Sequence, residues 1–120
     1  MTQLLHITDP ETWRQSRAAG EYAMSTRGVT LAEQGFIHTS LPHQVGRIAD
    51  LVYPDTAHLV ILVIDTGRLT VPVRYEAAEP GGEQFPHIYG PLSADAVTET
   101  VLVGRDATGQ LILPPSLGAA

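Results

Sequence analysis

The sequence predicts one small domain of the α+β class. The chain has 120 residues, which is an ordinary length for a single domain. Apolar residues make up 43% of it and charged residues 17%, proportions that are typical of a globular fold rather than of a disordered chain. Segments with strand and helix signals follow one another irregularly, whereas a doubly wound α/β sheet requires regular alternation. Together these observations favour α+β.

The N-terminal segment predicts a strand followed by a helix. Leu4–Thr8 is a short apolar run of the kind found in strands. Asp9 suits an N-cap and Pro10 suits the first helical position, so a helix is expected to begin there. This helix carries Trp13 and ends near Gly20, because glycine readily adopts the left-handed conformation that terminates helices.

Three short elements are expected next. Val29–Gln34 predicts a helix closed by Gly35, and Phe36–Thr39 predicts a strand. Leu41–Leu51 has apolar residues at helical spacing, which predicts a second amphipathic helix. Ser40 stands directly before this segment and is a candidate for its N-cap.

The C-terminal half is expected to be mostly strands. Leu59–Asp65 is the strongest strand, because it is apolar nearly throughout, as in a sheet covered on both faces. Leu69–Glu76 alternates, but Pro72 limits it to a sheet edge or a bulge. His87–Tyr89 is expected to be a brief strand. The last elements are a helical turn at Ser93–Val97 capped by Ser93, and a hairpin of Thr98–Arg105 with Leu111–Leu113.

No repeat or linker divides the chain. We expect one domain over residues 1–113 and a flexible tail over 114–120, which contains prolines and small residues. The start of the chain lacks the features of a signal peptide, and the longest apolar run, Leu59–Ile64, is too short to span a membrane. Cysteine is absent, which excludes disulfides and thiolate metal sites and suits a reducing compartment. We therefore expect a cytoplasmic protein that is a monomer or a small homo-oligomer.

Charge narrows the range of partners. The net charge is −6, so duplex nucleic acid is not an expected partner, since its binding depends on neutralising phosphates. All seven basic residues are arginines, which are good bidentate ligands for phosphate or carboxylate. The charge is still compatible with a local basic pocket that binds one nucleotide.

Histidines in two strand segments are the first candidate site residues. His6 and Thr8 share one face of the first strand. His6 is either a partly buried histidine bonded to a backbone carbonyl or a donor at the edge of a cleft. In the segment after Gly35, the side chains of Phe36, His38 and Ser40 share a face, which indicates an aromatic-walled pocket with a few polar groups.

A third polar segment follows a glycine-rich loop. In Phe85–Pro91, the side chains of His87 and Tyr89 alternate onto one face between two prolines. Arg74 and Glu76 share a face upstream, where they are either a weak surface ion pair or part of the site. We expect His6, His38 and His87 to converge on one cleft. The histidine spacing matches no zinc signature, so no metal is expected, although a histidine-metal hydrolase stays an alternative.

Together these segments resemble the DUF952 family, a family of unknown function. The similarity runs in order from about Leu4 to Val97. Its most specific element is the run of residues 85–90, Phe-Pro-His-Ile-Tyr-Gly. The other matching elements are Leu5-His6-Ile7-Thr8, Trp13, Gly35-Phe36-Ile37-His38-Thr39-Ser40 with Gln44, Leu62-Val63-Ile64-Asp65 and Arg74-Tyr75-Glu76.

The family is similar to the ADP-ribosyltransferase superfamily, which implies a split, mostly antiparallel sheet with NAD bound in a cleft. The resemblance implies that His6 holds a ribose hydroxyl and that His38 lines the nicotinamide pocket. It places His87 near the third motif position, with His87 or Glu76 as base or electrostatic partner. The implied catalytic residues are His6, His38, His87 and Glu76, and the implied ligand-binding residues are Thr8, Ser40, Gln44, Arg74 and Tyr89.

At the third motif position, the sequence departs from many of these transferases. They have a glutamate where this chain has His87, with Glu83 upstream, and the histidine-rich pattern is closer to the RNA 2′-phosphotransferase branch. We therefore expect a nucleotide-cleft protein with a small-molecule nucleotide substrate, transferring ADP-ribose from NAD or acting as an RNA 2′-phosphotransferase. The acceptor is left open. The alternatives are a non-catalytic module that binds a metabolite or nucleotide, and the metal hydrolase.

Overall fold

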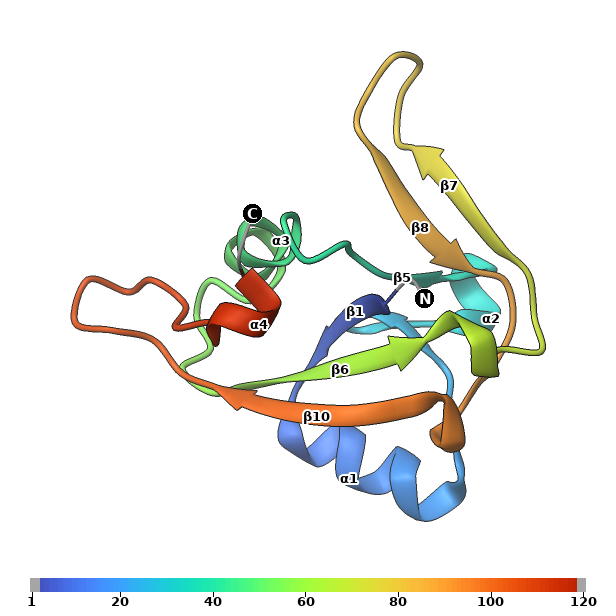
Figure 1. Cartoon of the computed structure of the whole chain (residues 1–120), viewed down its shortest axis with the longest axis horizontal. Helices are drawn as coiled ribbons and strands as arrows, with labels where there is room; N and C mark the ends of the chain where they lie inside the picture. The colour runs from blue at the N-terminus through green and yellow to red at the C-terminus, as the bar shows by residue number, and fades with distance from the viewer. Residues whose placement is uncertain (1–2, 119–120) are drawn as a thin grey trace.

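The structure is a computed structural model that describes residues 3–118. At its centre is an antiparallel sheet with the strand order β1-β6-β10. Its strands are β1 (Gln3–Thr8), β6 (Leu59–Asp65) and β10 (Val97–Val103). Helices lie on both sides of this sheet, and the hairpin of β7 and β8 projects from it (Figure 1). The α+β class, with antiparallel sheets and short helices, is confirmed.

Strand β6 is buried on both faces, as its apolar run predicts. Leu59, Ile61 and Val63 belong to one hydrophobic core cluster. Leu62 and Ile64, which point the other way, belong to a second cluster. Because successive side chains of a strand point to opposite faces, a continuous apolar sequence is what a strand between two cores requires.

Helix α1 (Pro10–Ala19) covers one side of the sheet (Figure 1). Asp9 is its N-cap and accepts a hydrogen bond of 2.8 Å from the backbone N–H of Thr12. Gly20 ends the helix with a φ of 83°, in the left-handed region that favours glycine. The predicted start and end of this helix are therefore confirmed.

Helix α3 (Val45–Val52) lies on the other side of the sheet, beside the short α4 (Pro115–Gly118) (Figure 1). The prediction of a helix from Leu41, capped by Ser40, is wrong at this end. Ser40 is extended, and its backbone exchanges hydrogen bonds of 2.7 and 2.8 Å with Leu5, so the helix begins only after an intervening turn. The bridge between Leu5 and Ser40 instead links the central sheet to the segment that contains His38.

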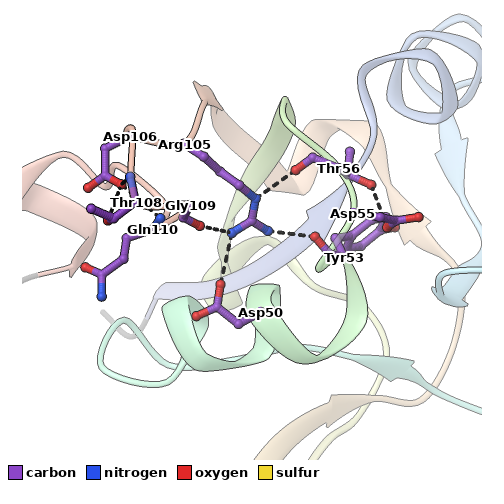
Figure 2. A network of polar contacts seen from close by, with 9 residues as sticks. All are labelled: Asp50, Tyr53, Asp55, Thr56, Arg105, Asp106, Thr108, Gly109 and Gln110. Carbon is purple, nitrogen blue, oxygen red and sulfur yellow. Dashed lines mark hydrogen bonds and ion pairs between the residues drawn. The ribbon is translucent and has the colours of Figure 1, made fainter.

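Arg105 holds the C-terminal end of α3 in place (Figure 2). Its guanidinium donates to the backbone oxygens of Tyr53 and Thr56, at 2.6 and 2.8 Å, and to Asp50 Oδ1 at 3.0 Å. It also donates to the backbone oxygen of Gly109 at 3.0 Å. These contacts tie the loop after β10 to the helix. The predicted pairing of Thr98–Arg105 with Leu111–Leu113 is limited to its end next to the turn, where Arg105 and Leu111 form a bridge and the N–H of Ile112 donates to the Gly104 oxygen at 2.8 Å.

One residue of the predicted flexible tail, residues 114–120, packs in the core. Leu117 in α4 is only 4% exposed and packs in the same cluster as α3. Residues 119 and 120 lie outside the described part of the chain.

A second antiparallel sheet has the order β5-β8-β7. It consists of β5 (Ile37–His38), β8 (Gln84–Ile88) and β7 (Val73–Ala77). The predicted strand from Leu69 begins only after Pro72, because proline has no N–H to donate to a ladder. Strand β8 begins earlier than the predicted His87–Tyr89, since its register with β7 extends back to Gln84.

Short elements connect these layers. Strands β2 (Glu21–Tyr22) and β9 (Leu92–Ser93) pair, as do β3 (Met24–Thr26) and β4 (Val29–Thr30). The predicted helix at residues 29–34 is shorter, because its first two residues belong to β4 and only α2 (Leu31–Gln34) is helical. The remaining turns are η1 (Thr66–Arg68) and η2 (Ala94–Ala96), the latter capped by Ser93 as predicted. Within residues 3–118, no helix is long and apolar enough to cross a membrane.

Candidate functional site

Strand register places the predicted polar residues on one face of the β5-β8-β7 sheet. His38 of β5 is paired with His87 of β8, and His87 is paired with Arg74 of β7. Side chains of directly paired residues lie on the same face, and so do those of residues two positions apart. Glu76 therefore joins this face, and Tyr89, just beyond β8, contributes its ring to the same group of side chains.

Aromatic rings pack against one another on this face. Phe36 stacks on His87, with ring centroids 4.1 Å apart and planes at 20°. The rings of His38 and Tyr89 lie 4.8 and 5.3 Å from Phe36, and the rings of His38 and His87 lie 5.0 Å apart. We call Phe36, His38, His87 and Tyr89 the aromatic cluster.

Glu76 is hydrogen-bonded to two members of this cluster. His87 Nδ1 lies 2.9 Å from Glu76 Oε1, and the Tyr89 hydroxyl donates to the same oxygen at 2.5 Å. These two bonds, that of Tyr89 foremost, lower the pKa of the Glu76 carboxyl, so the group is ionised at neutral pH. A carboxylate can only accept, so His87 Nδ1 carries the hydrogen of this bond and Nε2 is the basic nitrogen of a neutral His87.

The aromatic cluster and Glu76 line a cleft of about 620 Å³. Ile48, Val52 and Tyr53 from the α3 segment, together with Leu5 and Ile7 of β1, supply apolar lining. Sites for small ligands are typically clefts of roughly 300–1,000 Å³ with mostly apolar walls and few polar groups. The cleft has the size and composition of such a site.

His38 is the least constrained imidazole in the cleft. Its ring is half-buried, and its nitrogens make no hydrogen bond within the described part of the chain. Burial, followed by the proximity of His87, lowers the pKa of His38, so the ring is neutral at neutral pH. A ligand in the cleft can therefore bond to it without displacing an internal partner.

His6 also lines the cleft, but both of its ring nitrogens have partners. Nδ1 lies 2.5 Å from the backbone oxygen of His38, and Nε2 lies 2.7 Å from the hydroxyl of Tyr22. Since a carbonyl only accepts, Nδ1 carries the hydrogen and Nε2 accepts from Tyr22. Burial lowers the pKa of His6 to about 4. The contacts of His6 match the first interpretation, a buried histidine bonded to a backbone carbonyl. Its position at the cleft matches the second.

The nine predicted site residues are not all in the cleft lining. Six of them line it: His6, His38, Ser40, Glu76, His87 and Tyr89. Thr8, Gln44 and Arg74 lie outside the lining. Thr8 is buried beside the hydroxyls of Tyr22 and Tyr53, while Arg74 is exposed, with its guanidinium 5.0 Å from the Tyr89 ring centroid.

Gln44 fixes the position of the β7–β8 hairpin. Its side-chain oxygen accepts from the N–H of Leu41 at 2.9 Å, and its amide donates to Glu83 Oε2 and to the backbone oxygen of Gln84, both at 2.9 Å. The neighbouring Arg47 forms an ion pair with Glu83. Because Gln44 is 1% exposed and bonded at both ends, it acts on the cleft by positioning its walls.

Several residues of the site are not predicted from the sequence: a buried partner of His6 and some of the residues that line the cleft. Tyr22, the partner of His6, lies in a two-residue strand with no motif around it. Tyr53 comes directly after α3, and the apolar spacing of that helix predicts core packing only. Thr26, Gln34 and Phe85 also line the cleft, and of these only Phe85 lies in a segment that the sequence indicates as part of a site.

A second hollow, of about 690 Å³, has mixed charge and none of the predicted site residues. Its lining includes Arg17, Arg68, Asp95 and Glu99. Arg68 donates to the backbone oxygen of Asp95 at 3.3 Å, so part of this charge is already used within the protein. No group of three histidine, aspartate or glutamate side chains in residues 3–118 is arranged to hold a metal ion. The cleft is thus the stronger candidate for a site.

Comparisons with known proteins agree with the family expected from the motifs. Among curated proteins, none matches this chain significantly. The crystal structure of protein CC0527 from Caulobacter crescentus has a TM-score of 0.81 and 30% sequence identity, covering 97% of this chain and 98% of that chain. The solution NMR structure of CC0527 has a TM-score of 0.75 and 31% identity, covering 92% and 91%. A family model described as "Protein of unknown function (DUF952)" matches residues 7–100, and the chain therefore belongs to the DUF952 family.

Proposed function

We propose that the cleft binds NAD and that the protein transfers its ADP-ribosyl group, as an ADP-ribosyltransferase-like enzyme of the DUF952 family. One observation carries this proposal: the ionised carboxylate of Glu76 is held by His87 and Tyr89 within an aromatic cleft. Many transferases of that superfamily use a glutamate in the third motif, where this chain has His87. Strand pairing brings Glu76 of β7 next to that position, so the neighbouring strand supplies the carboxylate.

The chemistry suits an anion at this place. Cleavage of the bond between nicotinamide and ribose C1′ passes through an oxocarbenium-like state, in which positive charge develops on the sugar. A fixed carboxylate in a cleft with few other polar groups stabilises such charge, because it needs no reorganisation during the reaction. Phe36, His38 and Tyr89 offer ring surfaces against which the nicotinamide can pack.

The proposed transfer breaks one bond, forms one bond and moves one proton. The electron pair of the C1′–N bond remains on the nicotinamide nitrogen, and a nucleophile of the acceptor forms the new bond to C1′. Nε2 of His87 receives the proton of that nucleophile, since Nδ1 is directed to Glu76. In this proposal Ser40, which lines the cleft, binds a ribose hydroxyl, and Arg74, which lies outside the lining with its guanidinium 5.0 Å from the Tyr89 ring centroid, binds a phosphate. The bond from His6 to the His38 carbonyl positions the strand that carries the cluster.

Calorimetric titration with NAD tests binding, and mass spectrometry of the same mixture tests turnover. We expect a dissociation constant between about 10 μM and 1 mM, within the usual range of substrate affinities. We also expect release of nicotinamide, which Glu76→Gln abolishes. Acceptors, including an RNA with a 2′-phosphate, are added in separate reactions. Absence of both heat and thermal stabilisation at millimolar NAD would remove the proposal.

One observation favours a non-catalytic binding module as the second candidate. Both nitrogens of His6 are bonded within the protein, so they are not free to hold a ribose hydroxyl. A module of this kind binds NAD or a related nucleotide in the same cleft and leaves it intact. Binding without release of nicotinamide, with or without acceptors, identifies this alternative.

A further inference from the structure

The charges in the cleft are strongly asymmetric. Among the described residues that line it, Glu76 is the only one of the types Asp, Glu, Lys and Arg. The other polar lining groups are imidazoles, hydroxyls and an amide. Burial keeps His6 and His38 neutral at neutral pH. Glu76 is therefore the one carboxylate in the described lining, which has no arginine or lysine, and its partner His87 adds a positive charge only when protonated.

The charge of Arg74 acts on Glu76 from outside the cleft lining, but within residues 3–118 no hydrogen bond or ion pair joins the two side chains. Both hydrogen bonds to Glu76 end on Oε1, and within residues 3–118 its carboxylate forms no ion pair with an arginine. Glu83, on the same hairpin, is different: it is paired with Arg47 and bonded to Gln44. In a protein with seven arginines, the carboxylate at the cleft is left available for a positive charge from outside.

The aromatic cluster attracts the same kind of group. The face of an aromatic ring is negative, and a cation within about 6 Å of its centroid is stabilised. The protein already makes one such contact, because the guanidinium of Arg74 lies 5.0 Å from the centroid of the Tyr89 ring. A guanidinium is a planar cation, so this contact shows the kind of group that the cluster accepts.

We propose that the cleft selects a positively charged planar ring, such as an N-alkylated pyridinium, over the neutral ring of the same shape. This inference rests on the proposed function and specifies its substrate: the oxidised nicotinamide ring is such a cation, and the reduced ring is not. Cleavage at C1′ leaves its electron pair on the ring nitrogen, so the nicotinamide product is neutral. The attraction to Glu76 is thereby lost, which favours departure of the product.

The test compares 1-methylnicotinamide, which is cationic, with nicotinamide, which is neutral. Both are titrated calorimetrically at about pH 8, where free imidazole is uncharged. We expect 1-methylnicotinamide to bind at least about tenfold more tightly to the wild-type chain, and we expect Glu76→Gln to reduce this ratio to about one. Glu79→Gln is the matched control, because Glu79 is exposed in the loop of the same hairpin, and it should leave the ratio unchanged.

Two results would overturn the inference: equal or tighter binding of nicotinamide to the wild-type chain, or an unchanged preference in Glu76→Gln. Thermal unfolding of both variants checks that they are folded. A parallel comparison of NAD with NADH separates this inference from the proposed function. If neither dinucleotide binds but 1-methylnicotinamide is preferred over nicotinamide, the proposed function fails and the selection of a cation stands. If NAD is bound and cleaved without any preference for the cation, the reverse holds.

Discussion

The polar networks around Arg105 and Glu76 are both built on one charged side chain, but they differ in how completely that side chain is bonded within the protein. Arg105 donates to three backbone oxygens and to Asp50, which balances its charge (Figure 2). Its side chain is only 12% exposed. The network ties the loop after β10 to α3 and to the segment that follows α3. It leaves few hydrogen-bonding positions of Arg105 available to an external group.

Around Glu76 the bonding is incomplete. One of its oxygens accepts two hydrogen bonds, and no arginine within residues 3–118 forms an ion pair with it. The neighbouring imidazole of His38 makes no hydrogen bond within the described part of the chain. The Glu76 side chain is 36% exposed and His38 is half-buried, so the open positions of both groups can be reached by a ligand in the cleft. The comparison teaches that the first network stabilises the fold and that the second is suited to binding.

The largest effect is expected at Arg105. Arg105→Ala removes charged hydrogen bonds, of which the two to the carbonyls of Tyr53 and Thr56 are partly buried, and we expect the free energy of unfolding to fall by about 3 kcal/mol. Denaturation in urea measures this change. Arg14→Ala is the control, since Arg14 is 70% exposed in its ion pair with Glu11 and should have no measurable effect. If both variants unfold at the wild-type midpoint, the Arg105 network does not stabilise the fold.

The second effect concerns the pH dependence of stability and comes from His6. Its pKa is about 4 in the folded protein and about 6.5 when unfolded, so the unfolded chain binds more protons as the pH falls. The contribution of His6 is therefore constant above about pH 7 and turns unfavourable below it. We expect the wild-type chain to lose about 2 kcal/mol more than His6→Gln between about pH 7 and pH 4.5.

Urea denaturation at several pH values measures this difference, because the other titrating groups are common to both chains. His43→Gln serves as control, since His43 is exposed, and it should follow the wild-type curve. Parallel pH curves for the wild-type chain and His6→Gln would show that His6 takes up its proton equally easily in the folded and unfolded states.

At Glu76 we expect a change in ligand affinity and not in stability. Glu76→Gln keeps the shape of the side chain but removes its charge, so we expect the urea midpoint to stay close to that of the wild-type chain. The affinity for NAD should fall about tenfold, equivalent to about 1.4 kcal/mol, and titration calorimetry measures it. A large loss of stability with unchanged affinity would place Glu76 with Arg105 as a structural residue.

The smallest effect is expected at Tyr89. Tyr89→Phe keeps the ring and removes one of the two donors to Glu76, while His87 still holds the carboxylate. We expect NAD affinity to fall about threefold, with a larger loss on combining this change with His87→Ala. Affinity equal to that of the wild-type chain in the double variant would show that the orientation of Glu76 is not needed for binding.

The two networks also differ in how far the sequence predicts them. Local signals are reliable where neighbouring residues decide the structure: Asp9 and Pro10 start α1, and the run Leu59–Asp65 is a strand between two cores. Alternation correctly places Phe36 with His38 and His87 with Tyr89 on shared faces. The family is likewise indicated by the motifs.

Pairings between distant segments could not be read from the sequence. Strand register alone sets His38 opposite His87 and brings Glu76 within reach of both donors. The bond from His6 to Tyr22 joins residues whose only link is tertiary packing. Ser40 illustrates the converse error, because its local signal for a helix cap is overridden by its pairing with Leu5.

Nuclear magnetic resonance of the histidine rings during a titration with NAD tests the central claim most directly. The chain has five histidines, and His43 and His58 are exposed outside the cleft, so they are internal controls. If the cleft is the binding site, the ring signals of His38 and His87 shift with saturable dependence on NAD, while those of His43 and His58 remain in place. Unchanged signals from His38 and His87 at millimolar NAD, or shifts confined to the two exposed histidines, would contradict the account.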